Sequence, residues 1–253
     1  MMTPIILASL LSLTLTSDAV EPLPNPWEIK PEFSYFLYQE PDNMSEDGSM
    51  KGLSGSYTAY RNPGFNRMEV RYSSGEVDYD GKLLFDDYGD IPYTINNCKD
   101  YIVDIRLLTG SQKASQEQTS QFYIGLGYRY LNDDMSSDPA GYKRESNYLY
   151  LPLGLRARLE LDQGWYVAWT LEFDLLLHGR QNSYLPQQTI RNKQSRGIGS
   201  QGSLELGCHV KGFDFGISPF VRTWLIDASN LDQGYQEPYN TTLEYGMSVV
   251  VRF

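Results

Sequence analysis

The sequence predicts an all-β protein, a closed antiparallel up-and-down transmembrane β-barrel with ten strands. Three observations lead to this prediction. Segments with alternating apolar and polar residues recur along the chain, the connections between them alternate between short and long, and the polar faces hold glycine and arginine rather than lysine. The 253 residues also include 20 tyrosines, a residue type that favours strands with one dry and one wet side.

The chain begins with a segment that is typical of a secretory signal. An apolar run over residues 4–15 precedes Ser17 and Ala19, which have the spacing of small residues before a signal-peptidase site. The run is too short for a transmembrane helix, and no lysine or arginine precedes it. We expect a signal peptide over residues 1–19, cleaved after Ala19, and a barrel over residues 20–253. The alternatives are a buried N-terminal helix or a misassigned start.

Ten strand segments follow. The first two, near residues 32–40 and 52–60, are the least regular, because FSYFLYQ is apolar on both faces. The other eight are RMEVRYSSGEVDYDG, DYIVDIRLL, QFYIGLGYRYL, NYLYLPLGLRARLEL, GWYVAWTLEFDLLLHG, GSLELGCHV, FDFGISPFVRTWL and TTLEYGMSVVVRF. In the first of these eight, the apolar residues change faces between Tyr72 and Val77, so we expect a β-bulge at residues 73–75.

The connections between these segments alternate strictly in length. The short ones are RNPGFN, SQKASQEQ, DQG and KG. The long ones are PDNMSEDGSMK, GKLLFDDYGDIPYTINNC, NDDMSSDPAGYKRES, RQNSYLPQQTIRNKQSRG and DASNLDQGYQEPYN. Short turns at one end and long loops at the other are typical of membrane barrels, which also need an even number of strands.

Alternation alone does not decide which face is inside, because a soluble sandwich or a lipocalin-like barrel would bury the apolar face. The polar face repeatedly holds glycine, which weakens a solvated strand but leaves room for large side chains inside a narrow barrel. Its mid-strand cations are arginines, which suit an enclosed ion-pair network. We expect such a network in the lumen, with the structural members Arg71, Asp104, Arg106, Arg129, Arg156, Arg158, Glu160, Glu172, Asp174, Glu205, Arg222 and Glu244.

Aromatic residues recur near the ends of the strands, as the two interfaces of a bilayer require. They are Tyr72, Tyr79, Tyr101, Tyr128, Tyr130, Trp165, Phe213 and Phe253. We therefore expect the apolar face to contact lipid.

The closing segment YGMSVVVRF, with its terminal phenylalanine, is similar to the C-terminal insertion signal of Gram-negative outer-membrane β-barrel proteins. The resemblance covers essentially the whole chain after the signal. It implies an outer-membrane location, contact with lipid and lipopolysaccharide, and recognition by the assembly machinery through Tyr245, Val249, Val251 and Phe253. The stretches GEVDYDG and IGLGYRYLNDD also resemble an uncharacterised family of proteobacterial barrels, which implies no activity.

Composition excludes several classes of function. A net charge of −11 without clustered lysine and arginine argues against nucleic acid as a partner. Cys98 and Cys208 have neither the spacing of a disulfide framework nor that of a metal site, and the sequence has no phosphate-binding loop, zinc spacing or calcium loop. We expect no cofactor.

Two enzymatic alternatives depend on His178. A protease of the omptin type needs an Asp-His couple, but Asp174 lies four residues from His178, about 13 Å along a strand. A lipid-modifying enzyme needs a serine or histidine near the outer leaflet, and Ser183 does not have the required spacing. His209 lies close to a short turn, at the opposite end from His178. A small pore is a further alternative. We favour a lumen plugged by side chains and a non-enzymatic surface-exposed binding or envelope-structural role through the long loops, with an unknown ligand.

Overall fold

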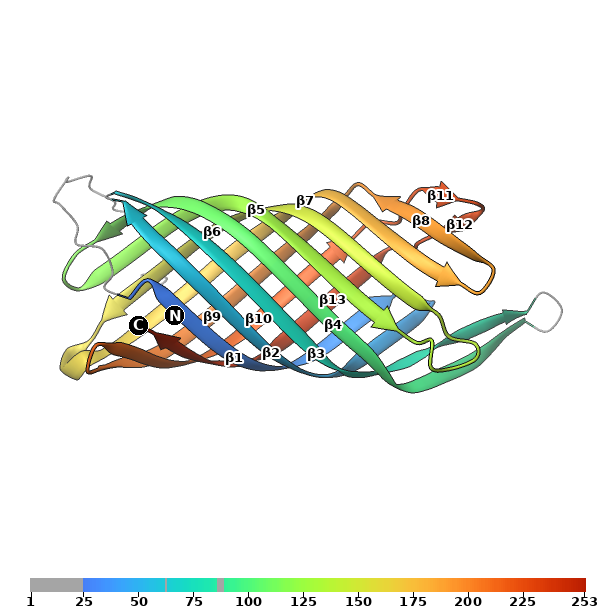
Figure 1. Cartoon of the computed structure of the whole chain (residues 1–253), viewed down its shortest axis with the longest axis horizontal. Coiled ribbons are helices and arrows are strands. Elements are labelled where there is room, and N and C mark those ends of the chain that lie inside the picture. Colours follow the sequence, from blue (N-terminus) through green and yellow to red (C-terminus); the bar gives the residue numbers. More distant parts are fainter. Residues whose placement is uncertain (1–24, 62, 86–88) are drawn as a thin grey trace, which may run out of the picture.

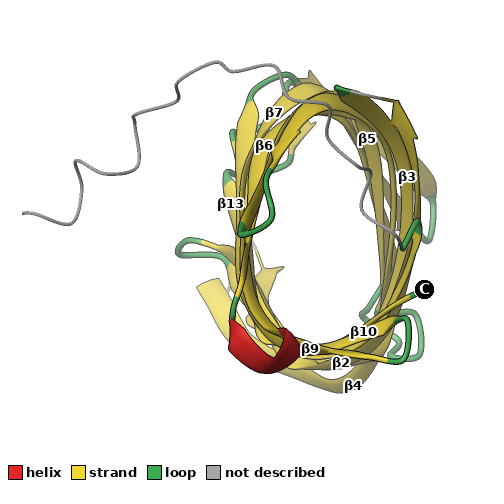
Figure 2. Cartoon of the chain, turned by 90° about the vertical axis from the view of Figure 1, so that its left-hand side faces the viewer, coloured by secondary structure: helices red, strands yellow, loops and turns green. Residues whose placement is uncertain are grey.

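The structure, a computed structural model, describes residues 25–61, 63–85 and 89–253, and it confirms the closed all-β barrel (Figure 1). The predicted signal peptide lies outside the described residues. Ten antiparallel strands pair in the order β6-β5-β4-β3-β2-β1-β13-β10-β9-β7, and β7 pairs back to β6 (Figure 2). No helix within the described residues is long and apolar enough to cross a membrane. The barrel strands are β1 (Trp27–Glu40), β2 (Met44–Arg61), β3 (Gly64–Phe85), β4 (Gly89–Ala114), β5 (Gln118–Asp134), β6 (Lys143–Glu160), β7 (Trp165–Leu185), β9 (Gly197–Val210), β10 (Phe213–Ile226) and β13 (Asn240–Arg252).

The last strand closes the ring against the first. β13 pairs with β1 on one side and with β10 on the other. The backbone groups of Trp27 and Phe253 exchange two hydrogen bonds of 3.1 Å each. We call the end of the barrel where these two residues lie the terminal end, and the opposite end the hairpin end (Figure 1).

The short connections at the terminal end are as tight as expected. The DQG connection is a single 3-10 turn, η1 (Asp162–Gly164), between β6 and β7. The KG connection between β9 and β10 places Lys211 and Gly212 at φ angles of 49° and 88°. Two consecutive residues with positive φ are typical of the tight turns that match the twist of antiparallel strands.

At the hairpin end, much of the sequence expected in the long connections is paired strand. The connection from β1 to β2 consists of residues 41–43, and β3 and β4 extend into a long hairpin. β7 continues to Leu185 and turns into β8 (Gln188–Gln194), which precedes β9. The connection from β10 to β13 contains a small hairpin, β11 (Leu231–Asp232) and β12 (Tyr235–Gln236), and residues 135–142 between β5 and β6 contain no strand. Paired strands satisfy backbone donors and acceptors that an irregular loop would leave to water.

Over the middle of the barrel the apolar side chains point outward. Leu107, Phe122 and Leu171 are 58%, 58% and 60% exposed, whereas Tyr166 and Glu244, on the inner face, are almost completely buried. Rows of aromatic rings border this apolar band: Tyr72, Tyr101 and Tyr130 lie side by side towards the hairpin end, with centroids 6.1 and 5.7 Å apart. An exterior of this kind suits the hydrocarbon core of a bilayer and its interfaces.

Towards the hairpin end the interior also holds large apolar side chains. Phe36, Met50, Val77, Cys98 and Ile102 belong to one buried cluster inside the barrel, and Tyr79 packs against it. Tyr79 is therefore an interior residue, and its assignment to a membrane interface was wrong.

The β-bulge predicted at residues 73–75 is absent. The apolar interior at the hairpin end accounts for the pattern that suggested it. β3 keeps its alternation from Phe65 to Val77. The register shifts further along, where Val77 and Tyr79 pair with Cys98 and Ile95 and the extra residue lies in β4, next to Asn97 at a φ of 60°. The apolar residues of β3 face outward along the apolar band and inward beyond it, as Val70 and Val77 show. The pattern of residue types therefore changes, while side chains keep alternating between the two faces.

Candidate functional site

The lumen is filled by large side chains that lie over glycines of neighbouring strands. A Cβ atom on Gly127 would lie 2.2 Å from the ring of Tyr150, and one on Gly154 would lie 2.1 Å from the ring of Tyr123. Gly207 has the same relation to Tyr166, at 2.3 Å. Each glycine thus makes space for a tyrosine that reaches into the lumen.

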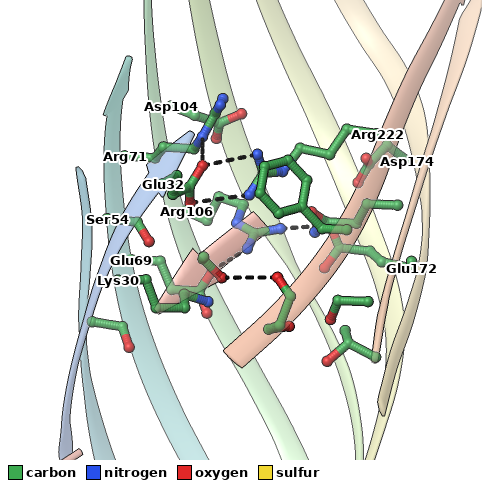
Figure 3. A pocket seen from close by; sticks show the side chains of 18 of the residues that line it. Lys30, Glu32, Ser54, Glu69, Arg71, Asp104, Arg106, Glu172, Asp174 and Arg222 are labelled. Carbon is green, nitrogen blue, oxygen red and sulfur yellow. Dashed lines mark hydrogen bonds and ion pairs between the residues drawn. The ribbon is translucent and has the colours of Figure 1, made fainter. Parts of the chain in front are cut away.

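A first group of ion pairs joins β1, β3, β10 and β13 in the middle of the barrel (Figure 3). Glu32 accepts hydrogen bonds from Arg71, at 2.9 Å, and from Arg222, at 3.0 and 3.1 Å. Arg71 also binds Glu244, which in turn accepts a hydrogen bond of 2.8 Å from Ser34. The two carboxylates therefore share two guanidinium groups, an arrangement in which buried charges compensate each other.

A second group reaches across the lumen from β4 to β7. Arg106 binds Glu69 on β3 and donates a hydrogen bond of 2.5 Å to Glu172 on β7. Glu172 also accepts a hydrogen bond of 2.6 Å from the hydroxyl of Tyr123. Between these groups lies a cavity of about 90 Å³, large enough for several water molecules.

A third group fills the terminal end. Arg252 binds Glu28 at 2.6 Å and Glu205 at 2.6 and 2.7 Å. Arg158 binds Asp214, which also contacts Nδ1 of His209. Nη2 of Arg158 lies 2.8 Å from Nε2 of His209. Because a guanidinium group only donates hydrogen bonds, Nε2 is the acceptor in this contact.

A fourth group lies at the hairpin end around Arg144 of β6. Arg144 donates to Glu40, Glu46 and Asp133, which come from β1, β2 and β5. Glu237, in the connection before β13, accepts a hydrogen bond of 3.3 Å from Tyr38. It lies outside the membrane-spanning strands, and burial, followed by repulsion from Glu40, raises the pKa of its carboxyl to about 8.

All the residues predicted for the lumen network lie on the inner face, but they do not all form ion pairs. Asp104 accepts a hydrogen bond from Tyr150, at 2.7 Å. Arg129 and Asp174 are buried, and no ion pair is found for either within the described chain. The nine that do form ion pairs are Arg71, Arg106, Arg156, Arg158, Glu160, Glu172, Glu205, Arg222 and Glu244.

Several partners were missing from the prediction. Glu28 and Glu32 lie in the first strand, whose irregular pattern hid its inner face. Arg67 has the parity of an inner residue in its strand, and this signal identifies it once the faces are assigned. Arg144 was missed because its segment was expected to be a long connection, whereas β6 already begins at Lys143.

The prediction that places His178 on the same face as Asp174 was wrong. Between Leu149 and Tyr150 the register of β6 with β7 shifts, and Leu177 is the extra residue. His178 then pairs with Leu149, whose side chain faces outward, and it is exposed. Asp174 remains inside the barrel, so the two side chains lie on opposite faces of β7.

The comparisons with known proteins agree with this architecture. No protein family model matches the chain, and no curated protein matches it. The outer membrane protease OmpT from Escherichia coli matches in structure with a TM-score of 0.60 and 8% identity, over 94% of this chain and 99% of that one. The fold is that of an outer-membrane β-barrel. The transport unit of the autotransporter AIDA-I from Escherichia coli matches with a TM-score of 0.45 and 10% identity, over 96% and 94% of the two chains.

The outer-membrane β-barrel fold does not specify an activity, because unrelated functions share it. The two histidines of the chain lie apart, His178 outside the barrel wall and His209 inside the terminal end. The most extensive arrangement of functional groups in the described chain is therefore the series of ion pairs that fills the lumen.

Proposed function

We propose that this chain is an outer-membrane barrel with a closed lumen, and that it has a non-enzymatic surface-exposed binding or envelope-structural role. The observation that supports this most directly is the series of ion pairs across the lumen. Arg106 connects β4 with β7, and Arg144 connects β6 with β1 and β2. In this proposal the terminal end faces the periplasm and the hairpin end faces the outside.

Enclosed charges of this kind would oppose ion flow. Arg71, Arg106 and Arg222 each bind acidic partners, so an ion entering the lumen would have to displace a formed ion pair. Buried pairs are costly to break, since removing one partner leaves the other charge uncompensated. The closed lumen leaves the exposed hairpins as the surface on which a ligand would bind.

We also propose contact with lipid and lipopolysaccharide. Towards the hairpin end, Arg180 of β7 and Lys193 of β8 are directly opposite each other and exposed, and Arg191 lies two residues along β8. Within the described chain, none of these three side chains forms an ion pair. Like charges in a cross-strand pair repel each other. Arg180 lies just beyond the apolar outer face of β7, where anionic lipid headgroups would compensate the positive charges of Arg180 and Lys193.

The C-terminal strand is proposed to direct assembly. Tyr245, Val249 and Phe253 are 51%, 49% and 41% exposed on the outer face of β13, and Val251 shares that face. These four side chains are thus accessible to a partner that recognises the strand before the ring closes.

The enzymatic alternatives find less support. A protease has the same fold, but His178 points out of the barrel and Asp174 points in. We expect peptidase and lipid-hydrolysis assays to detect no turnover that depends on His178, with His178→Ala as the variant that tests this.

Planar bilayer recordings test the closed lumen. We expect the wild-type barrel to show no steady conductance steps. The double variant Arg71→Ala and Arg222→Ala should introduce them, because it removes both guanidinium groups that bind Glu32. Lys51→Ala, an exposed change on β2, is the matched control and should stay closed. Large steady steps from the wild-type protein would overturn the proposal and favour a pore.

A further inference from the structure

Negative charge is concentrated in the lumen at the hairpin end. Four carboxylates from the barrel strands, those of Glu40, Glu46, Asp100 and Asp133, surround Arg144, and Glu237 of the last connection lies beside Glu40. All five acidic residues are buried. Arg144 is the one cation that contacts the four strand carboxylates within the described chain, so these carboxylates outnumber their positive partner. Burying such charge is unfavourable unless a counter-charge accompanies it.

Three of these carboxylates converge. One oxygen each from Glu46, Asp100 and Asp133 lies within 4.8 Å of the other two. Three oxygens with these separations lie at most about 2.8 Å from a common centre, close to the 2.3–2.6 Å that separates calcium from its oxygen ligands. The three residues come from β2, β4 and β5, so the closed barrel wall holds their backbones in place.

A separate observation points to a missing ligand. Asp100 is 2% exposed, and neither of its carboxylate oxygens forms a hydrogen bond. The backbone amide of Asp134 lies near this carboxylate without hydrogen-bond geometry. Oδ1 of Asp133 has no partner either, since Arg144 binds Oδ2. Buried polar atoms almost always have a partner, so three free oxygens at one place in the lumen need an explanation.

We propose that Glu46, Asp100 and Asp133 bind one calcium ion at the hairpin end of the lumen. Asp100 supplies its two free oxygens, Asp133 supplies Oδ1 and keeps its bond to Arg144, and Glu46 supplies one oxygen. Water completes the coordination. An all-oxygen set of carboxylates favours calcium or magnesium over metals that prefer nitrogen or sulfur, and the variable geometry of calcium suits ligands from three strands. The site is independent of the proposed function.

Direct binding tests the site in the full barrel, folded in detergent and stripped with EDTA. Calorimetric titration with calcium chloride should give one site per chain. Asp100→Asn should weaken binding at least ten-fold, because the amide keeps the shape and removes the charge. Asp80→Asn is the matched control: Asp80 is an exposed acid on β3, and its variant should bind calcium as the wild type does. An absence of saturable binding by the wild type would overturn the proposal, as would equal affinity in Asp100→Asn.

Thermal stability provides a second readout, separate from the calorimetric titration. In EDTA, Asp100→Asn should unfold at a higher temperature than the wild type, because it removes one uncompensated buried carboxylate. Calcium should raise the midpoint of the wild type and of Asp80→Asn, and raise that of Asp100→Asn much less. If calcium stabilises Asp100→Asn as much as the wild type, the ion binds elsewhere and the assignment is wrong.

Discussion

Arg144 on β6 donates a hydrogen bond of 3.0 Å to Glu40 on β1, from one side of the barrel to the other. Four strands separate β6 from β1 in either direction around the ring, so the two residues come from opposite walls. The same guanidinium binds Glu46 and Asp133 and lies 5.4 Å from the centre of the Tyr38 ring. A single side chain thus holds four strands together where the barrel leaves the apolar band.

Replacing Arg144 should destabilise the barrel strongly. Arg144→Met leaves Glu40, Glu46 and Asp133 buried without their cation, and breaking a buried pair costs about 3–5 kcal/mol. The midpoint of heat-modifiable gel migration, measured in EDTA, should fall accordingly. Arg61→Met, at the exposed end of β2, should leave it unchanged. Equal midpoints for Arg144→Met and the wild type would show that the contact contributes little.

The pairing of glycine with tyrosine in the lumen should be sensitive to one methyl group. Gly154→Ala places a Cβ atom against the Tyr123 ring, and overpacking of this kind costs roughly 1–3 kcal/mol. Gly55→Ala is the control, because its nearest neighbour would lie 3.9 Å away. Adding Tyr123→Leu to Gly154→Ala should recover part of the loss in urea unfolding. A loss as large in Gly55→Ala would show that the contact with the Tyr123 ring is not the cause.

Glu237 should make stability depend on pH. Its pKa of about 8 in the folded protein lies above the ordinary value of 4.5, so the folded state binds the proton more tightly than the unfolded state. The contribution of this group to stability therefore falls as the pH rises from about 4.5 to about 8.

A variant isolates this effect. Glu237→Gln should raise the thermal midpoint at pH 8 and change it little at pH 4.5. Glu117→Gln, in an exposed turn at the terminal end, should behave as the wild type at both pH values. A shift of the same size at both pH values would exclude titration of Glu237 as the cause.

The outward cations should govern binding to anionic lipid. Replacing Arg180 and Lys193 together by glutamine should weaken the binding of lipopolysaccharide at least ten-fold in a detergent-based assay. Lys51→Gln, an exposed change on β2, serves as the control. Phosphatidylglycerol vesicles, used as a second ligand, separate recognition of lipopolysaccharide from general attraction to anionic lipid. Unchanged binding by the double variant would remove these residues from the lipid contact.

Removal of the last residue should impair assembly without affecting lumen contacts. Phe253 lies on the outer face, 6.2 Å from the Phe213 ring between centroids, while Arg252 binds inside. A chain that ends at Arg252 should accumulate in unfolded form in cells, and it should still fold in detergent. Normal amounts of folded barrel in the outer membrane would contradict a role for Phe253 in insertion.

The period of two in segments such as NYLYLPLGLRARLEL and TTLEYGMSVVVRF determined the inner and outer faces of those strands. Lipid accepts no polar side chain readily and a narrow lumen needs small residues beside large ones, so Leu155 and Gly154 had to face opposite ways. For the same reason, the lumen-facing positions of Arg71, Glu172 and Arg222 were predictable before their partners were.

Only the tertiary structure decided which inner residues meet. Arg144 and Glu40 are 104 positions apart, and their contact depends on how far each strand is staggered around the closed ring. A single extra residue, Leu177, placed His178 outside, because a bulge reverses the parity of everything that follows. The convergence of Glu46, Asp100 and Asp133 was equally hidden, since it requires three strands to reach one height in the lumen. Alternation along a strand determines whether a residue faces the lumen or the lipid, unless a bulge reverses it. The stagger of the strands determines the residue's position along the barrel axis, and two residues meet only when face and position both match.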